Sequence, residues 1–321
     1  MEHTKQDRLL EIFFRLLRGE SLSVQKIANE YKISTKSVSR DINDLKAFFA
    51  DHRELVGNTE LKYSNQSKAY HLYMDEFLTN RELFALIEII IGARAFSKEE
   101  LLTLTNKLKG FTTATDLPML SDLIRKELYH YTEIKHECDS VQDTLWKLAS
   151  CITEKKEITV DYYRADRALK THRIRPTSLM FTDYYFYLIA FNTEGDPDKP
   201  LYFRVDRIKH ITEHRQHFTN DDAPEFDEGL LRQRSLFMWP GKLRTIRFEF
   251  TGSAIQAILD KLPTARITER NGRTYTVEAE VYGDGIKMWL LSQGRRVKVI
   301  APDDFVEEMK KEITAMANSY R

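Results

Sequence analysis

Arginines and tyrosines gather in the stretch Tyr184–Ile208, and their side chains are suited to binding a ligand. Aromatic and β-branched residues flank a loop with Gly195 and Pro197, a pattern typical of two paired strands. The two-residue period of a strand places Arg204 and Arg207 on opposite faces of the second strand. An aromatic sheet that projects arginines can stack on a flat ring and pair with an anion, so the stretch predicts a site for an anionic, ring-containing ligand.

The candidate ligand-binding residues all carry a guanidinium or a phenol. They are Tyr163, Arg173, Arg175, Tyr187, Arg204 and Arg207. Bases that stack on tyrosines while arginines contact the backbone would make a coherent site for a nucleotide or for single-stranded nucleic acid. The simpler interpretation of each arginine is a surface ion pair, for instance with Asp206 or Asp161.

Three motifs in this region resemble the WYL domain family. Residues 186–188, Phe-Tyr-Leu, stand where the family has Trp-Tyr-Leu, residues 203–208 look like its second signature, and residues 173–176 look like its Arg-x-x-Pro strand. The resemblance implies an Sm-like β-fold that acts as a ligand sensor, for which nucleotides and single-stranded nucleic acid are among the proposed ligands. Strands predicted at 157–163, 172–181, 184–192 and 201–212 form a small antiparallel barrel or sandwich.

A helix that begins after Ser34 carries polar and basic residues at its start. Ser34 has the side chain of an N-cap, and Val38, Ile42 and Leu45 make one buried stripe by helical period. Two shorter helices precede it, which together make a helix-turn-helix. The recognition helix of that motif offers its first residues to base edges in the major groove of DNA.

Two short strands within Glu60–Tyr73 predict a β-wing after these helices, and residues 38–45 match the Val-x-Arg-Asp-Ile-x-x-Leu pattern of the winged head that precedes WYL domains. The candidate DNA-binding residues are Thr35, Lys36, Ser37, Ser39, Arg40, Lys46, Lys62 and Lys68. The four helix residues before Arg40, Lys36 included, are predicted to contact bases, and Arg40 and the three later lysines mainly phosphates. The alternative is a three-helix domain whose lysines and arginines are solvated.

Two capping boxes, Thr79–Glu82 and Ser97–Glu100, each open an apolar helix in a predicted connector. The first of these helices is too apolar to stand free in water, so it packs on its neighbours or on a second subunit. Because a helix-turn-helix protein that binds two half-sites usually has two subunits, we expect a homodimer.

Residues 218–235 read as a linker, and the remainder predicts a βαββαβα order typical of a ferredoxin-like layer. Residues 288–294 and 300–302 resemble the helix and last strand of the extension that follows WYL domains. The basic residues Arg295, Arg296 and Lys298 either help to close a ligand site or are solvated, and the solvated interpretation is favoured.

Composition sets limits on these interpretations. The chain has 321 residues, zero formal net charge and two cysteines outside any Cys-x-x-Cys spacing. Zero net charge argues against a nucleic-acid coat protein, but a local DNA-binding surface depends only on where the charge lies. No signal peptide or apolar run of membrane-spanning length is evident, so we expect a cytoplasmic protein with no membrane partner.

One motif favours a different chemistry. Residues 210–214 fit the His-x-x-Glu-His pattern of zinc peptidases, but the pattern requires a helix, and here the predicted element is a strand. In a strand, His210 and His214 lie about 13 Å apart, too far to bind one ion. A zinc hydrolase is therefore disfavoured, and we expect no enzyme, metal or cofactor.

The sequence predicts an α+β chain with four parts: a winged helix-turn-helix at 1–75, a helical connector at 76–140, a WYL domain at 141–220 and its C-terminal extension at 236–321. The predicted function is a ligand-responsive regulator, favoured as a repressor, that binds a palindromic operator as a homodimer. The alternative is an RNA- or nucleotide-binding protein without operator binding.

Overall fold

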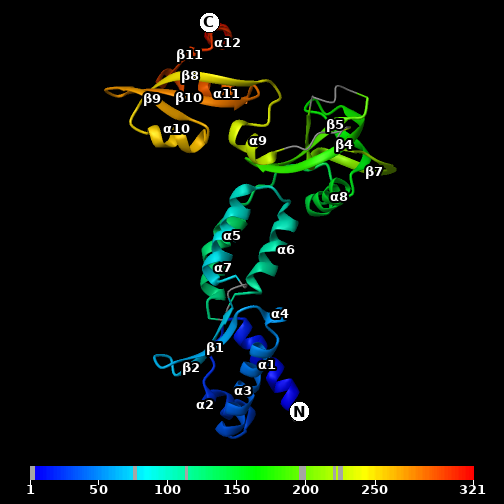
Figure 1. The fold of residues 1–321 in the computed structure, drawn as a ribbon, viewed down its shortest axis with the longest axis vertical. Helices are drawn as coiled ribbons and strands as arrows, with labels where there is room; N and C mark the ends of the chain where they lie inside the picture. The colour runs from blue at the N-terminus through cyan, green and yellow to red at the C-terminus, as the bar shows by residue number, and fades with distance from the viewer. Residues whose placement is uncertain (1–3, 75–77, 113–114, 195–199, 220–221, 223–226) are drawn as a thin grey trace. The chain divides into compact units, whose positions relative to one another are not determined.

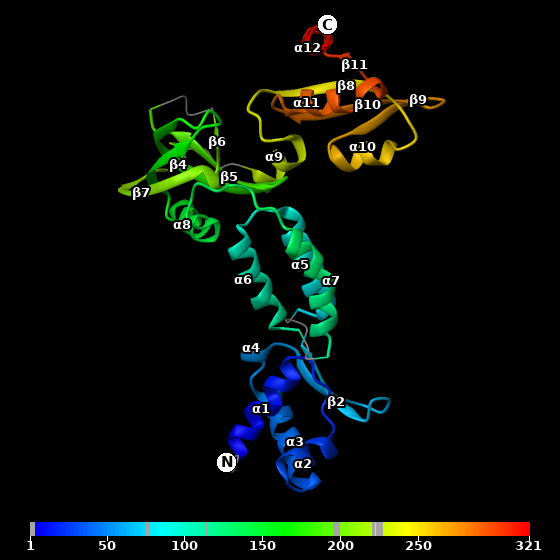
Figure 2. The same ribbon diagram turned by 180° about the vertical axis from the view of Figure 1, so that it is seen from behind.

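The computed structural model describes residues 4–74, 78–112, 115–194, 200–219, 222 and 227–321 (Figures 1 and 2). The chain divides into two compact units, Met1–Ile134 and Lys135–Arg321. Helices and three antiparallel sheets make up the described residues, so the predicted α+β class is confirmed, whereas the four domain boundaries remain predictions. No helix in the described ranges is long and apolar enough to cross a membrane.

The first unit opens with helices and a hairpin. The elements are α1 (Lys5–Leu17), α2 (Val24–Tyr31), α3 (Thr35–Asp51), α4 (Arg53–Val56), β1 (Thr59–Ser64) and β2 (Ala69–Met74). The Ser34 side chain caps α3 by accepting a hydrogen bond from the backbone N–H of Ser37 at 3.1 Å. Val38, Ile42 and Leu45 are buried, so the stripe predicted from helical period is confirmed.

A buried ion pair joins α1 to α3. Arg8 Nε donates to Asp41 Oδ2 at 2.7 Å, and Arg8 Nη2 donates to Asp41 Oδ1 at 3.2 Å. The side chains are 11% and 2% exposed, which leaves neither charge to water. Because a guanidinium and a carboxylate can form two parallel hydrogen bonds, the pair fixes the orientation of α3 relative to α1.

The rest of the first unit is a bundle of α5 (Asn80–Ala93), α6 (Lys98–Lys109) and α7 (Leu117–His130). Thr79 with Glu82 and Ser97 with Glu100 form the two predicted capping boxes. Ile87 and Leu101 are fully buried in a shared core, so α5 does pack on its neighbours as the sequence predicts.

The second unit begins with a helix and a five-stranded sheet. The elements are α8 (Val141–Thr153), β3 (Lys156–Tyr163), β4 (Leu169–Thr182), β5 (Tyr185–Asn192), β6 (Leu201–Arg204) and β7 (Ile208–His217), and the strand order is β6-β5-β4-β3-β7, all antiparallel. Leu148 of α8 packs with Ile158 and Leu188 on one face of the sheet. Figure 1 shows α8 beneath that sheet.

Two expectations about this region are wrong. The predicted strand over 201–212 is interrupted by a 3-10 turn, η1 (Val205–Arg207), because β6 and β7 lie at opposite edges of the sheet. Arg207 therefore does not take part in the alternation of β6. The predicted linker contains α9 (Glu228–Arg234), whose Leu231 is buried against the sheet, and the loop with Gly195 and Pro197 lies outside the described residues.

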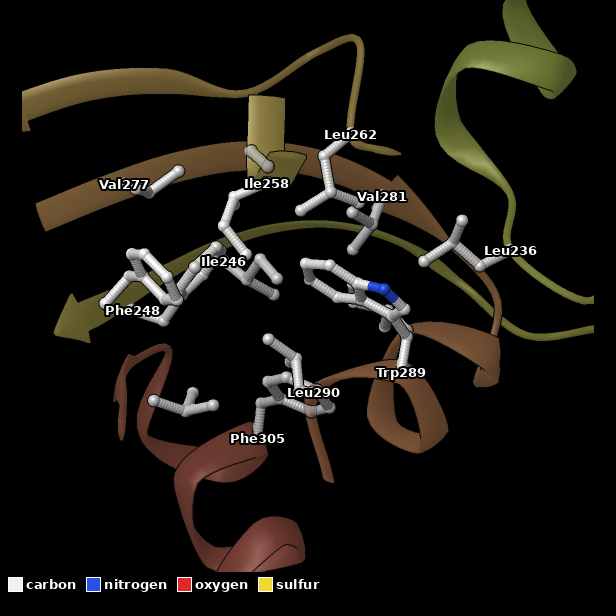
Figure 3. Close-up of a cluster of buried hydrophobic side chains, with 14 of the residues drawn as sticks. Leu236, Ile246, Phe248, Ile258, Leu262, Val277, Val281, Trp289, Leu290 and Phe305 are labelled. Atoms are coloured by element: carbon white, nitrogen blue, oxygen red, sulfur yellow. The ribbon is translucent and has the colours of Figure 1, made fainter. Parts of the chain in front are cut away.

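The C-terminal part is a second sheet with helices. The elements are β8 (Leu243–Thr251), α10 (Ile255–Lys261), β9 (Arg266–Asn271), β10 (Thr274–Tyr282), α11 (Gly285–Ser292), η2 (Gly294–Arg296), β11 (Val297–Ala301) and α12 (Asp303–Asn318). The predicted βαββαβα order is confirmed, with strand order β11-β8-β10-β9. Figure 3 shows Phe248, Trp289 and Phe305 in its core, which accounts for the tryptophan without a binding role.

Candidate nucleic-acid interface and ligand site

The first turns of α3 present three side chains to solvent. Thr35, Lys36 and Arg40 are exposed, and within the described residues none of their side chains makes a hydrogen bond or an ion pair. Their orientation follows from the buried stripe on the opposite face of the helix. A hydroxyl, an ammonium and a guanidinium on one helical surface can contact base edges and phosphates.

Ser37 and Ser39, also predicted as base contacts, already make hydrogen bonds within the helix. The hydroxyl oxygens of Ser37 and Ser34 lie 2.9 Å apart, and the Ser39 hydroxyl donates to the Thr35 carbonyl oxygen at 3.0 Å. A hydroxyl with one bond made retains acceptor capacity. Both serines therefore have less capacity for a base than free hydroxyls would have.

The lysines predicted to contact phosphates differ in the interactions that their side chains already make within the protein. Lys46 Nζ lies 5.0 Å from the centre of the Tyr70 ring, and Lys62 Nζ lies 2.5 Å from Glu60 Oε2. Hydrogen bonding to Lys62 lowers the pKa of Glu60, so Lys62 is the most neutralised of these cations. Lys68 is exposed at the hairpin turn, with a left-handed φ of 49°.

His71 is a residue of this surface that the sequence did not reveal. Its Nε2 lies 2.7 Å from Ser67 Oγ at the hairpin turn, and its Nδ1 lies 3.1 Å from Ser21 Oγ before α2. The ring therefore ties the wing to the helical core. No local pattern marks this role, because Ser21 lies fifty positions away in the chain.

In the second unit, Arg173 and Arg175 share one carboxylate. Arg173 Nη2 donates to Glu157 Oε2 at 2.9 Å, and Arg175 Nε donates to Glu157 Oε1 at 3.1 Å. Glu157 is only 8% exposed, and Arg175 also approaches Asp222 at 3.9 Å. Two cations facing two anions leave no excess positive charge. The cluster was predicted to bind a ligand, but its arginines are already neutralised by Glu157 and Asp222.

Arg204 has a different environment at the end of β6. Its Nη2 donates to Asp206 Oδ2 at 2.6 Å, and its guanidinium carbon lies 3.4 Å from the centre of the Tyr185 ring. Tyr187 is directly opposite Arg204 in the strand register, and burial raises the pKa of Tyr187 to about 12. Tyr185 is the residue that sequence reasoning missed, although its two-residue spacing from Tyr187 is the available signal.

The six predicted ligand residues therefore do not form one site. The Glu157 cluster and the Arg204 cluster lie toward different ends of the sheet, and Leu231 of α9 packs with Met180 and Ile189 next to Tyr187. Arg207 in η1 is half-buried, without an ion pair among the described residues, and Tyr163 lies on β3 with Lys209 Nζ 5.9 Å from its ring centre. Within the described part of the chain the predicted set forms two separate pairs, Arg173 with Arg175 at Glu157 and Tyr187 with Arg204.

The histidines of the zinc motif lie on β7, which is a strand. His214 Nε2 is 2.7 Å from Thr159 Oγ1, and His210 is exposed. The helical spacing that the zinc-peptidase pattern requires is thus not met. Among the described residues no group of three His, Cys, Asp or Glu side chains could hold a metal ion.

Comparison with known proteins identifies two domains in the second unit. Residues 143–213 match the WYL domain, and residues 242–317 match the WCX domain. The chain therefore carries both, and the WYL match spans the sheet that holds Arg204. A search of curated proteins found no relative.

Two solved structures are similar to this chain at low sequence identity. Proteasome accessory factor B/C (PafBC) of Arthrobacter aurescens is 15% identical, with a TM-score of 0.30 over 98% of this chain and 48% of that one. A CRISPR Cas-related protein is 15% identical, with a TM-score of 0.40 over 77% of this chain and 75% of that one. This chain thus spans about half the length of PafBC.

Proposed function

We propose that the chain is a DNA-binding transcription regulator in which α3 is the recognition helix and the WYL domain senses an effector. The observation that carries the proposal is the exposed surface of Thr35, Lys36 and Arg40 at the start of a helix held by a buried ion pair. Side chains that have no partner within the protein can contact DNA without first breaking an internal bond. The WYL domain supplies the sensing half of the proposal.

In its finer form, the regulator is a repressor that binds a palindromic operator as a homodimer. The hairpin lysines, Lys62 and Lys68, flank the recognition helix as a wing and contact phosphates. A two-fold protein on a two-fold operator places two recognition helices one helical turn of DNA apart.

The effector site proposed here is centred on Arg204, Tyr185 and Tyr187. Because Asp206 balances the charge of Arg204, binding there depends on stacking and on the remaining guanidinium N–H donors rather than on excess charge. A nucleotide or a single-stranded nucleic acid offers both a flat ring and acceptor oxygens. Arg207 in the adjoining turn adds a cation that has no ion pair within the described residues.

A mobility-shift assay on DNA upstream of the chain's own gene tests the proposal. We expect Arg40→Ala and Lys36→Ala together to weaken binding by about 2 kcal/mol or more, since each well-placed contact contributes about 1–3 kcal/mol. Lys126→Ala removes an exposed cation on α7 and serves as the matched control. Duplex binding that is equal in the double variant and the control would contradict the proposal.

A second candidate is an RNA- or nucleotide-binding protein that binds no operator, which the stacking of Arg204 on Tyr185 favours. It predicts that Arg204→Met abolishes binding to a single-stranded oligonucleotide while Arg40→Ala has no effect on any nucleic acid. The regulator predicts that, of these two variants, only Arg40→Ala weakens duplex binding. We propose no catalytic role, and metal analysis of the purified protein tests the zinc-hydrolase alternative.

A further inference from the structure

The outward face of α5 is apolar although the helix has already buried its inward face. Leu83 and Ile87 are fully buried in the bundle, whereas Ile89 is 65% exposed and Leu86 is 38% exposed. A helix that is apolar all round is normally covered all round. The outward face thus lacks a partner within the described residues of the bundle.

This face forms a short ridge of large and small residues. The ridge consists of Ala85, Leu86, Ile89, Gly92 and Ala93, which share one side of the helix by its 3.6-residue period. A side chain added at Gly92 would meet no atom within 4 Å, so the space beside it is open. Leu86 before the centre of the ridge and Gly92 after it, at equal distances from Ile89, allow the ridge to match its own inverted copy.

The match becomes explicit when two copies of α5 are placed antiparallel about a two-fold axis at Ile89. Residues at equal distances before and after Ile89 then face each other. Leu86 faces Gly92 of the second copy, so this large side chain meets a residue without one, and Ala85 faces Ala93. Ile89 meets itself at the axis, where ridge packing brings helices to about 8–10 Å.

Charge does not oppose this arrangement. Glu82 is the acidic residue at the start of the ridge, where its carboxylate accepts hydrogen bonds from the backbone N–H and the hydroxyl of Thr79. In the antiparallel pair the two copies of Glu82 lie at opposite ends, about 21 Å apart along the axis at 1.5 Å per residue. The antiparallel helix dipoles are also favourably aligned.

We infer that the outward ridge of α5 is a docking surface for α5 of a second copy of this chain. The inference rests on the proposed function, because it supplies the surface of the homodimer that operator binding requires. One helix pair buries less than a standard protein interface, so the contact alone is weak. When the helix-turn-helix parts of two copies bind adjacent half-sites, the raised effective concentration strengthens the contact between the two α5 helices.

Cross-linking tests the two-fold geometry directly. We expect Ile89→Cys to form a disulfide-linked dimer under mild oxidation, because a residue on the axis meets its own copy at disulfide distance. Glu99→Cys on α6 is the matched control, exposed but off the ridge, and the unmodified chain gives the background of the native cysteines. Cross-linking of Ile89→Cys no faster than that of Glu99→Cys would overturn the inference.

A charge placed on the ridge tests the same contact without oxidation. Ile89→Asp is expected to raise the dimer dissociation constant about tenfold or more in sedimentation, since it sets two carboxylates face to face. Its melting temperature should stay near that of the unmodified chain because Ile89 is exposed. An unchanged dissociation constant would refute α5 as the dimer surface.

DNA binding separates this inference from the proposed function. If both hold, Ile89→Asp binds a single half-site normally and loses affinity for the full operator. If the regulator proposal alone fails, no variant binds duplex DNA, yet Ile89→Cys still cross-links.

Discussion

Asp41 and Arg40 are neighbours in the sequence but occupy opposite environments. Asp41 is 1% exposed and holds Arg8, whereas Arg40, about 100° further round the helix, is exposed. Asp41 therefore orients the helix, whereas Arg40 is the residue proposed to contact DNA. The two roles are told apart by the burial of each side chain and not by the motif itself.

Asp41→Ala is expected to destabilise the chain by about 3–5 kcal/mol, because it leaves a buried guanidinium without its acceptor. Urea unfolding followed by circular dichroism measures the loss. The double variant Arg8→Met, Asp41→Leu removes both charges and should recover most of it. If the double variant is as unstable as the single one, the pair is not what holds α1 to α3.

Glu20 predicts a dependence of stability on pH. Hydrogen bonds from Arg15 and Lys26 lower the pKa of Glu20 from 4.5 to about 2. Because the folded pKa lies below the unfolded one, its contribution is present above pH 4.5 and is lost as the pH falls toward 2. Glu20→Gln should therefore be less stable than the unmodified chain at pH 6, with the difference shrinking by pH 2.5, as urea midpoints at the two values would show.

At the scale of the element, local signals predicted most of the helices and strands correctly. Caps and period-based stripes depend on neighbouring residues, so Ser34 and the capping boxes were readable from the sequence. The turn at Val205–Arg207 and helix α9 were missed because both depend on distant strands. Leu231 is helical and buried only because Met180 and Ile189 of the sheet lie beneath it.

The candidate site was predictable to the same extent. Composition revealed a set of arginines, yet nothing local showed that Glu157 takes two of them while Arg204 stacks on Tyr185. Ion pairs across strands depend on register, which the sequence of a single strand does not define. The predicted ligand residues thus lie on or beside one sheet, as expected, but they do not gather into one site.

The cap of α3 can be separated from its contact with DNA by two substitutions. Ser34→Ala should cost about 1 kcal/mol of stability through loss of the N-cap hydrogen bond. Ser34→Asp keeps a capping oxygen, so stability should be retained, but its negative charge beside the phosphates should weaken DNA binding. Thermal unfolding and a duplex binding isotherm on both variants measure the two effects. Equal duplex affinity for Ser34→Asp and the unmodified chain would show that DNA does not bind beside the start of α3.

For the whole chain, zero net charge means that the proposed regulator has weak long-range attraction to DNA and depends on its local cations. Duplex affinity should fall with salt in proportion to the phosphates contacted, with a slope of about −0.9 per phosphate on logarithmic axes. Arg40→Ala should reduce that slope by about 1 if Arg40 contacts a phosphate, whereas Lys126→Ala should leave it unchanged. A slope that Arg40→Ala does not alter would assign Arg40 to a base edge or to no contact.

Coupling between the effector and DNA must be reciprocal, and this gives the proposed regulator its strictest test. An effector shifts operator binding only if its affinity differs between two arrangements of the chain. Any factor by which the effector changes operator affinity must equal the factor by which the operator changes effector affinity.

With a short single-stranded oligonucleotide as probe, a tenfold loss of operator binding requires a tenfold loss of probe binding when the operator is present. Arg204→Met should lower probe affinity and leave operator affinity intact in the absence of probe, because Arg204 lies in the WYL domain and not on α3. If the probe lowers operator affinity equally in the unmodified chain and in Arg204→Met, it acts through a surface other than the Arg204 site, and the sensor would then have to be sought elsewhere in the chain.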